Sequence, residues 1–253
     1  MQNLNNHKKN NTFREPSVGS KSKFSAIALL RPSLSKVITI SQLLFFSYVF
    51  TGVGVLAETN SNNSAGQPRN PLYREGLALI EARDYKSAVD SLTLFLDKNP
   101  SSDNGYYLRG KAYHELGDLD KASFDYNQAI KLNPESYKSY NNLGLIYGRI
   151  KKFDLAKKTF SKAIKINPQP KEALNNRGVA KAATGDPNGA INDFTKSIEI
   201  DEKYLEPLLN RSFVLEMQGE LNRACDDWEQ ASLLGSKNAK IWHKFQCKKA
   251  NKI

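Results

Sequence analysis

The chain has 253 residues, of which 40% are hydrophobic and 25% are charged, a composition typical of a folded protein. Its net charge of +11 is unevenly placed: residues 1–57 and 237–253 each carry six more bases than acids, and the body between them is close to neutral. A nucleic-acid-binding groove needs positive charge on the folded body, so this distribution disfavours nucleic acid as a partner.

The first 57 residues form a basic leader that ends in an apolar segment. Residues 37–57 contain no charged side chain and are followed by a polar linker, residues 58–68. A basic lead, an apolar run and small residues at Val55 and Ala57 are typical of a secretory signal peptide cleaved after Ala57. The same run is long enough to remain as a transmembrane anchor, and an organelle presequence is a third alternative. With a signal or an anchor, the rest of the chain lies outside the cytoplasm, in a periplasm or lumen, or secreted.

A 34-residue period runs through residues 69–236. Each unit repeats the same residue type at the same position: proline at Pro100, Pro134 and Pro168; glycine at Gly76, Gly110, Gly144 and Gly178; alanine at Ala88, Ala122, Ala156, Ala190 and Ala224; and a large side chain at Leu92, Tyr126, Phe160, Phe194 and Trp228. Apolar spacings of three and four predict two amphipathic helices in every unit. The small residues let the two helices approach closely, and proline ends the second helix.

This pattern resembles the tetratricopeptide repeat, a helix–turn–helix unit with small, aromatic and proline residues at these positions. The resemblance covers five units, residues 69–102, 103–136, 137–170, 171–204 and 205–236. It implies an all-α, right-handed superhelical solenoid that acts as a protein–protein interaction module. Glu202 replaces the proline of the fourth unit, and Ser212 replaces the glycine of the fifth. We expect these departures to weaken two repeats and to leave the register unchanged.

A sixth unit begins at Ala239 and ends after its first helix, and we expect residues 237–253 to form a capping helix and a basic tail at the apolar end of the stack. The two cysteines, Cys225 and Cys247, lie at equal distances in sequence from the turn near Gly235 and Ser236. Two antiparallel helices would place them at the same level. An even number of cysteines beyond an export signal favours a disulfide, and two buried free thiols are the alternative.

An asparagine recurs at the sixth position of the last three units. At ~100° per residue, positions 2, 6, 9 and 13 of the first helix share a stripe that faces away from the second helix. We expect this stripe to form the inner wall of the solenoid, where carboxamides would donate to and accept from a peptide backbone. The predicted peptide-binding residues are Asn142, Asn176, Asn210, Leu145, Val179, Phe213, Lys138, Arg149, Tyr107 and Lys111.

Some tetratricopeptide proteins grip extended peptides with asparagines at this position, so the resemblance favours that role. The alternative is that the asparagines are solvated or bond a neighbouring helix. Glu172 and Glu206 stand where a clamp for a terminal carboxylate needs cations, so that mode of binding is disfavoured.

The sequence contains no phosphate-binding loop, nucleophile elbow or metal-spaced histidine pair. We therefore expect no enzymatic activity, no cofactor, no metal and no small-molecule substrate. The preferred hypothesis is an exported or membrane-tethered scaffold that binds a partner peptide in its concave groove and supports complex assembly. The alternative is a structural envelope or membrane-associated element that organises a complex through its outer surface and basic cap, without a groove ligand.

Overall fold

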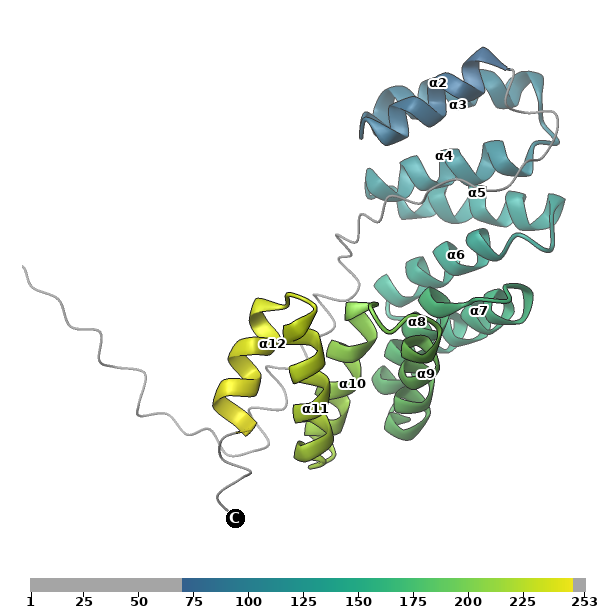
Figure 1. Cartoon of the computed structure of the whole chain (residues 1–253). Helices are drawn as coiled ribbons and strands as arrows, with labels where there is room; N and C mark the ends of the chain where they lie inside the picture. Colours follow the sequence, from purple (N-terminus) through teal and green to yellow (C-terminus); the bar gives the residue numbers. More distant parts are fainter. Residues whose placement is uncertain (1–69, 248–253) are drawn as a thin grey trace, which may run out of the picture. The chain divides into compact units, whose positions relative to one another are not determined.

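The computed structural model describes residues 70–247, and every regular element among them is a helix (Figure 1). The predicted leader with its apolar segment 37–57, the linker 58–68 and the last six residues of the basic tail lie outside the described residues. Within residues 70–247, no helix combines the length and the apolar character that crossing a membrane requires. The predicted all-α fold class is confirmed for the described part of the chain.

The helices form five consecutive pairs and a C-terminal cap. Their bounds are α2 (Pro71–Glu81), α3 (Tyr85–Lys98), α4 (Asp103–Glu115), α5 (Leu119–Leu132), α6 (Tyr137–Arg149), α7 (Phe153–Ile166), α8 (Lys171–Ala183), α9 (Pro187–Ile200), α10 (Leu205–Met217), α11 (Leu221–Leu233), α12 (Lys237–Trp242) and the π-helix η1 (His243–Cys247). Each helix packs against the next one along the chain, so the pairs stack in sequence order as a solenoid (Figure 1).

The recurrent glycine lies where the two helices of a pair approach most closely. A Cβ atom added at Gly144 would lie 2.6 Å from the ring of Phe160, and one added at Gly178 would lie 2.6 Å from the ring of Phe194. Both rings are fully buried. The aromatic side chain of the second helix therefore occupies the space beside the glycine, and a larger residue there would meet an interior already packed to high density.

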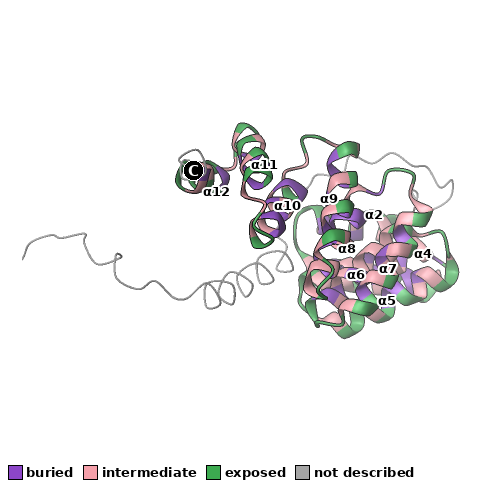
Figure 2. Ribbon diagram, turned by 90° about the horizontal axis from the view of Figure 1, so that it is seen from below, coloured by how far each residue is buried: buried purple, intermediate pink, exposed green. Residues whose placement is uncertain are grey.

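The turn inside each pair depends on a residue with a left-handed backbone. The residues at this position are Arg83 (φ 61°), Gly117 (φ 81°), Lys151 (φ 61°), Gly185 (φ 78°) and Gly219 (φ 81°). Glycine adopts this conformation without the steric cost that a Cβ atom brings, which explains its use in three of the five turns. Figure 2 shows that burial concentrates on the helix faces that meet, and that exposed residues lie on the outer faces and in the turns.

The C-terminal cap packs on α11. Ala239 and Cys247 are buried there, and the rings of Trp228 and Trp242 have centroids 6.4 Å apart. The structure contains the predicted disulfide between Cys225 and Cys247, whose Cα atoms are 5.7 Å apart. The apolar end of the fifth pair is thus covered by a helix that is covalently joined to it.

Candidate peptide-binding site

The recurrent asparagines connect successive repeats. Nδ2 of Asn210 donates to Oδ1 of Asn175 at 2.8 Å, and Nδ2 of Asn176 donates to Oδ1 of Asn141 at 3.1 Å. In both bonds the acceptor lies 35 residues earlier, in the first helix of the preceding unit. In the first helix of unit 4, Asn175 therefore accepts a bond from the next unit, and the adjacent Asn176 donates a bond to the previous unit.

Asn142 has a different partner, because the preceding unit carries Tyr107 instead of an asparagine at the corresponding position. Nδ2 of Asn142 donates to the hydroxyl oxygen of Tyr126 in α5 at 3.3 Å. Tyr126 is completely buried, and burial raises the pKa of its hydroxyl well above the usual value, so the group stays neutral. Asn142 is therefore held by the second helix of the preceding unit.

Two of the predicted peptide contacts are not accessible. Asn210 is 5% exposed and Val179 is 0% exposed. The Asn210 amide is bonded to α8, and Val179 packs with Phe194 and Val214 in an apolar cluster of α8, α9 and α10. Their predicted role as peptide contacts is corrected to helix packing, because α10 lies close enough to α8 to cover the side chains at these positions.

The remaining predicted contacts keep at least part of their side chains exposed. Asn176 and Phe213 do so on α8 and α10. The others lie on two neighbouring first helices, and we name them the α4–α6 surface: Tyr107, Lys111, Lys138, Asn142, Leu145 and Arg149. The ten predicted residues lie in four units, and six of the eight that keep exposed surface lie on units 2 and 3.

Buried groups between α4 and α6 link residues of this surface. The ring of Tyr107 has its centroid 6.1 Å from that of Tyr126, whose hydroxyl accepts the bond from Asn142. Burial lowers the pKa of His114 on α4, and the guanidinium of Arg149 on α6 lowers it further, against the opposing effect of Glu115. The positive charge of Arg149 on α6 therefore lies close enough to α4 to affect the pKa of His114 in the preceding unit.

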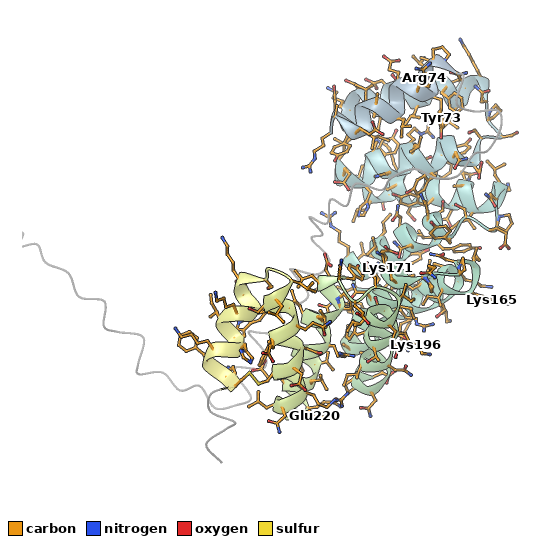
Figure 3. All side chains as sticks on the ribbon, in the orientation of Figure 1. Tyr73, Arg74, Lys165, Lys171, Lys196 and Glu220 are labelled. Atoms are coloured by element: carbon orange, nitrogen blue, oxygen red, sulfur yellow. A yellow bond between two sulfur atoms is a disulfide. The ribbon has the colours of Figure 1, made fainter. Side chains whose placement is uncertain are left out.

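The charge of the first helices changes along the stack. Lys138 on α6 is replaced at the equivalent positions of α8 and α10 by Glu172 and Glu206. Lys171 at the start of α8 (Figure 3) is also neutralised, since its Nζ lies 2.7 Å from a carboxylate oxygen of Asp201. Among the described residues, the cation of Lys111 has no carboxylate within 4.0 Å. Lys111 therefore leaves positive charge on the α4–α6 surface, whereas the equivalent first helices α8 and α10 carry Glu172 and Glu206.

Sequence reasoning missed a cluster of arginine, aspartate and a hydroxyl that recurs in three units. The clusters are Arg109 with Asp125 and Thr93, Arg177 with Asp193 and Ser161, and Arg211 with Asp227 and Thr195. In each, the aspartate accepts two bonds from the guanidinium, and the hydroxyl comes from the second helix of the preceding unit. The aspartate stands 16 residues after the arginine and the hydroxyl 16 before it, a spacing that a search at the 34-residue period would have found.

These clusters join helices and do not offer a binding site. The Asp125 side chain is 1% exposed, and burial raises its pKa while the hydrogen bonds from Arg109 counteract that rise. Unit 3 lacks the cluster because Leu143 and Thr159 stand at the arginine and aspartate positions. The contact between units 2 and 3, on which the α4–α6 surface lies, is thus made without the guanidinium bonds found elsewhere.

Metal and small-molecule sites are not evident in the part of the chain that the structure describes. Residues 70–247 contain no group of three or more His, Cys, Asp or Glu side chains placed to hold a metal ion. An open hollow of about 390 Å³ lies beside the first arginine cluster, away from the predicted wall. Its lining is Thr93, Arg109, Tyr113, Asp120, Lys121, Phe124 and Asp125.

Comparison with known families gives four matches to repeat models. Models described as tetratricopeptide or TPR repeat match residues 72–102, 110–151, 137–170 and 171–204. No curated protein matches the chain significantly.

Solved structures with the same fold include three named proteins. The crystal structure of MamA is 21% identical and covers 65% of this chain and 96% of its own, with a TM-score of 0.59. PilF of Pseudomonas aeruginosa is 19% identical over 66% of this chain and 76% of its own, with a TM-score of 0.62. YrrB is 18% identical over 69% of this chain and 90% of its own, with a TM-score of 0.57. At these identities the likeness concerns the fold alone, and together with the stacked helix pairs the four family matches support a tetratricopeptide repeat protein.

Proposed function

We propose that this protein is a non-enzymatic scaffold that binds a polypeptide segment of a partner protein on the α4–α6 surface. Proteins with tetratricopeptide repeats typically act as protein–protein interaction modules, and the YrrB structure is described as a TPR protein with an unusual peptide-binding site. The observation that carries the proposal is the difference in exposure along the wall. At the same position of the repeat, Leu145 on α6 is partly exposed and Val179 on α8 is completely buried, while Asn142 and Asn176 are both partly exposed.

The chemistry of the surface favours an extended segment with acidic and apolar side chains. Lys111 and Arg149 supply positive charge, which speeds the encounter with an acidic segment and selects against a basic one. Tyr107 and Leu145 supply apolar area between these cations. Backbone groups of the segment would reach the carboxamide oxygen of Asn142, since its Nδ2 donates to Tyr126.

A phage-displayed peptide library, panned on the full chain, tests this function. We expect enriched peptides to bind the wild type and to lose at least tenfold in affinity on the variant Lys111→Glu/Arg149→Glu. The matched control is Lys165→Glu/Lys196→Glu, which makes the same charge change on exposed residues of the second helices (Figure 3). Peptides that bind both variants as well as the wild type, or a library from which nothing is enriched, would overturn the proposal and favour a structural role without a groove ligand.

We further propose that the repeats lie outside the cytoplasm, either as a protein exported after cleavage behind Ala57 or tethered through residues 37–57. The basic lead and uncharged run of the leader support this location. The disulfide between Cys225 and Cys247 also supports it, because such bonds persist mainly in oxidising compartments. The mass of the mature chain separates the two forms, since a chain that begins at Glu58 has lost its anchor. A full-length chain recovered only from the cytoplasm would contradict both.

A further inference from the structure

The C-terminal cap carries exposed apolar side chains beside a row of lysines. Ile241 is 52% exposed, Trp242 is 42% exposed and Phe245 is 64% exposed. Lys237, Lys240 and Lys244 on the same short segment are exposed as well, and we name these six residues the cap surface. None of them belongs to the α4–α6 surface, so an inference about the cap is independent of the proposed peptide binding.

The helical geometry of the cap separates a packed side from an open side. Ala239 and Cys247 are buried against α11, and the disulfide from Cys247 fixes this side. Ile241 and Phe245 are four residues apart and both largely exposed, so they lie on the open side. The side chain of Lys244 lies over the ring of Phe245, with Nζ 5.9 Å from its centroid. The apolar and the basic residues therefore form adjoining stripes of one surface.

The charge of the cap surface is not neutralised within the described part of the chain. Residues 237–253 contain no acidic residue. On α11, which packs against the cap, Asp227 is buried in its pair with Arg211, and Asp226 and Glu229 are exposed. None of the described carboxylates comes within 4.0 Å of a cap lysine.

We propose that the cap surface binds the headgroup region of an anionic lipid bilayer. Aromatic and aliphatic side chains beside lysines are the composition of segments that lie in the membrane interface, with rings at the headgroup level and cations on anionic lipid. Ile241, Trp242 and Phe245 would enter the interface, while Lys237, Lys240 and Lys244 bind the headgroups. The disulfide presents the segment in this orientation before contact, so binding needs no folding step.

Tryptophan fluorescence of the full chain tests this proposal at the site itself. The chain has two tryptophans, and Trp228→Phe leaves Trp242 as the only reporter. Phenylalanine fits this position because Phe160 and Phe194 occupy it in two other units. A local reporter is needed because residues 37–57 are themselves apolar enough to associate with vesicles.

We expect vesicles of phosphatidylcholine mixed with phosphatidylglycerol to shift the Trp242 emission to the blue and to protect it from acrylamide. Vesicles of phosphatidylcholine alone should do neither, and 1 M salt should reverse the effect. The variant Ile241→Ser/Phe245→Ser should lose the response. The control Leu94→Ser/Phe124→Ser removes two similarly exposed apolar side chains from the second helices and should retain it.

Three results would overturn the proposal. One is an emission that anionic vesicles leave unchanged. A second is a shift that persists in Ile241→Ser/Phe245→Ser or occurs equally with neutral vesicles, since the lysines and the exposed apolar residues would then not be the cause. The third is a shift with polyglutamate but not with vesicles, which would assign the cap surface to an acidic protein. Far-UV circular dichroism of each variant confirms that the helices remain folded.

Discussion

Nδ2 of Asn210 donates a 2.8 Å hydrogen bond to Oδ1 of Asn175, and both side chains are buried between the first helices of two successive repeats. A carboxamide can take this place because it both donates and accepts. Such bonds explain why an asparagine returns at a 34-residue interval: in each of the last three units, this asparagine donates to a side chain of the preceding unit.

The substitution Asn210→Ala should therefore destabilise the protein by about 1–3 kcal/mol, because it leaves the buried Oδ1 of Asn175 without its donor. The midpoint of urea denaturation measures the loss. Asn176→Ala is the matched control, since Asn176 and its acceptor Asn141 are both partly exposed. Equal losses for the two variants would show that burial of the amide pair does not matter.

The fold was predictable from the sequence because it follows from two periodic patterns, which single substitutions leave intact. A spacing of three and four residues fixes which face of a helix is buried, and the 34-residue repeat fixes the pairs. The glycine–aromatic contact of Gly144 and Phe160 follows from these alone, as the structure shows. The periods do not specify which side chains the next unit places against each first helix.

These neighbouring side chains decide whether position 9 of the first helix is a wall or a core residue. Leu145 remains partly exposed, whereas Val179 is completely buried beside Val214. The two residues have the same place in the repeat, and their difference comes from the side chains that each next unit brings. The arginine clusters escaped prediction because their members lie 16 residues apart on three helices, a spacing that only an alignment of the units at the 34-residue period brings out.

The variant Asp125→Ala should cost about 3–5 kcal/mol, because it leaves the half-buried guanidinium of Arg109 without its carboxylate. The double substitution Arg109→Leu/Asp125→Thr should cost less than Asp125→Ala alone, since it reproduces the pair that unit 3 uses at Leu143 and Thr159. A double-mutant cycle in urea, completed by the single variants Arg109→Leu and Asp125→Thr, measures the coupling. Simple additivity of the two single losses would mean that the charges act separately.

Removing the disulfide by Cys225→Ser/Cys247→Ser should lower the free energy of unfolding by about 3 kcal/mol, as expected for a bond that closes a loop of this length. The two cysteines are 22 residues apart, so the effect should be confined to α11 and the cap. Hydrogen exchange of the Ala239 amide reports on this region. Dithiothreitol should reproduce the change in the wild type and have no effect on the serine variant; a wild type insensitive to the reductant would contradict the prediction.

The stability of the repeats should fall in acid because carboxylates cap the second helices. Hydrogen bonds from the side chain and backbone N–H of Ser87 lower the pKa of Asp84, and those from Lys121 lower the pKa of Asp118. A carboxyl group whose pKa is lower in the folded state stabilises that state above its unfolded pKa of 3.8, and this stabilisation is lost as the pH falls through the folded value. Urea midpoints should therefore decrease between about pH 4 and pH 2.

Replacing both capping aspartates with asparagine separates the titration of the carboxyl groups from the hydrogen bonds that they accept. Asp84→Asn/Asp118→Asn keeps an acceptor for the first N–H groups of α3 and α5 but does not titrate, so the fall in the urea midpoint below pH 4 should become shallower. The matched control Asp90→Asn/Asp97→Asn removes two exposed carboxylates inside α3 and should keep the slope of the wild type. If the two double variants respond to acid in the same way, the caps are not the groups whose protonation unfolds the repeats.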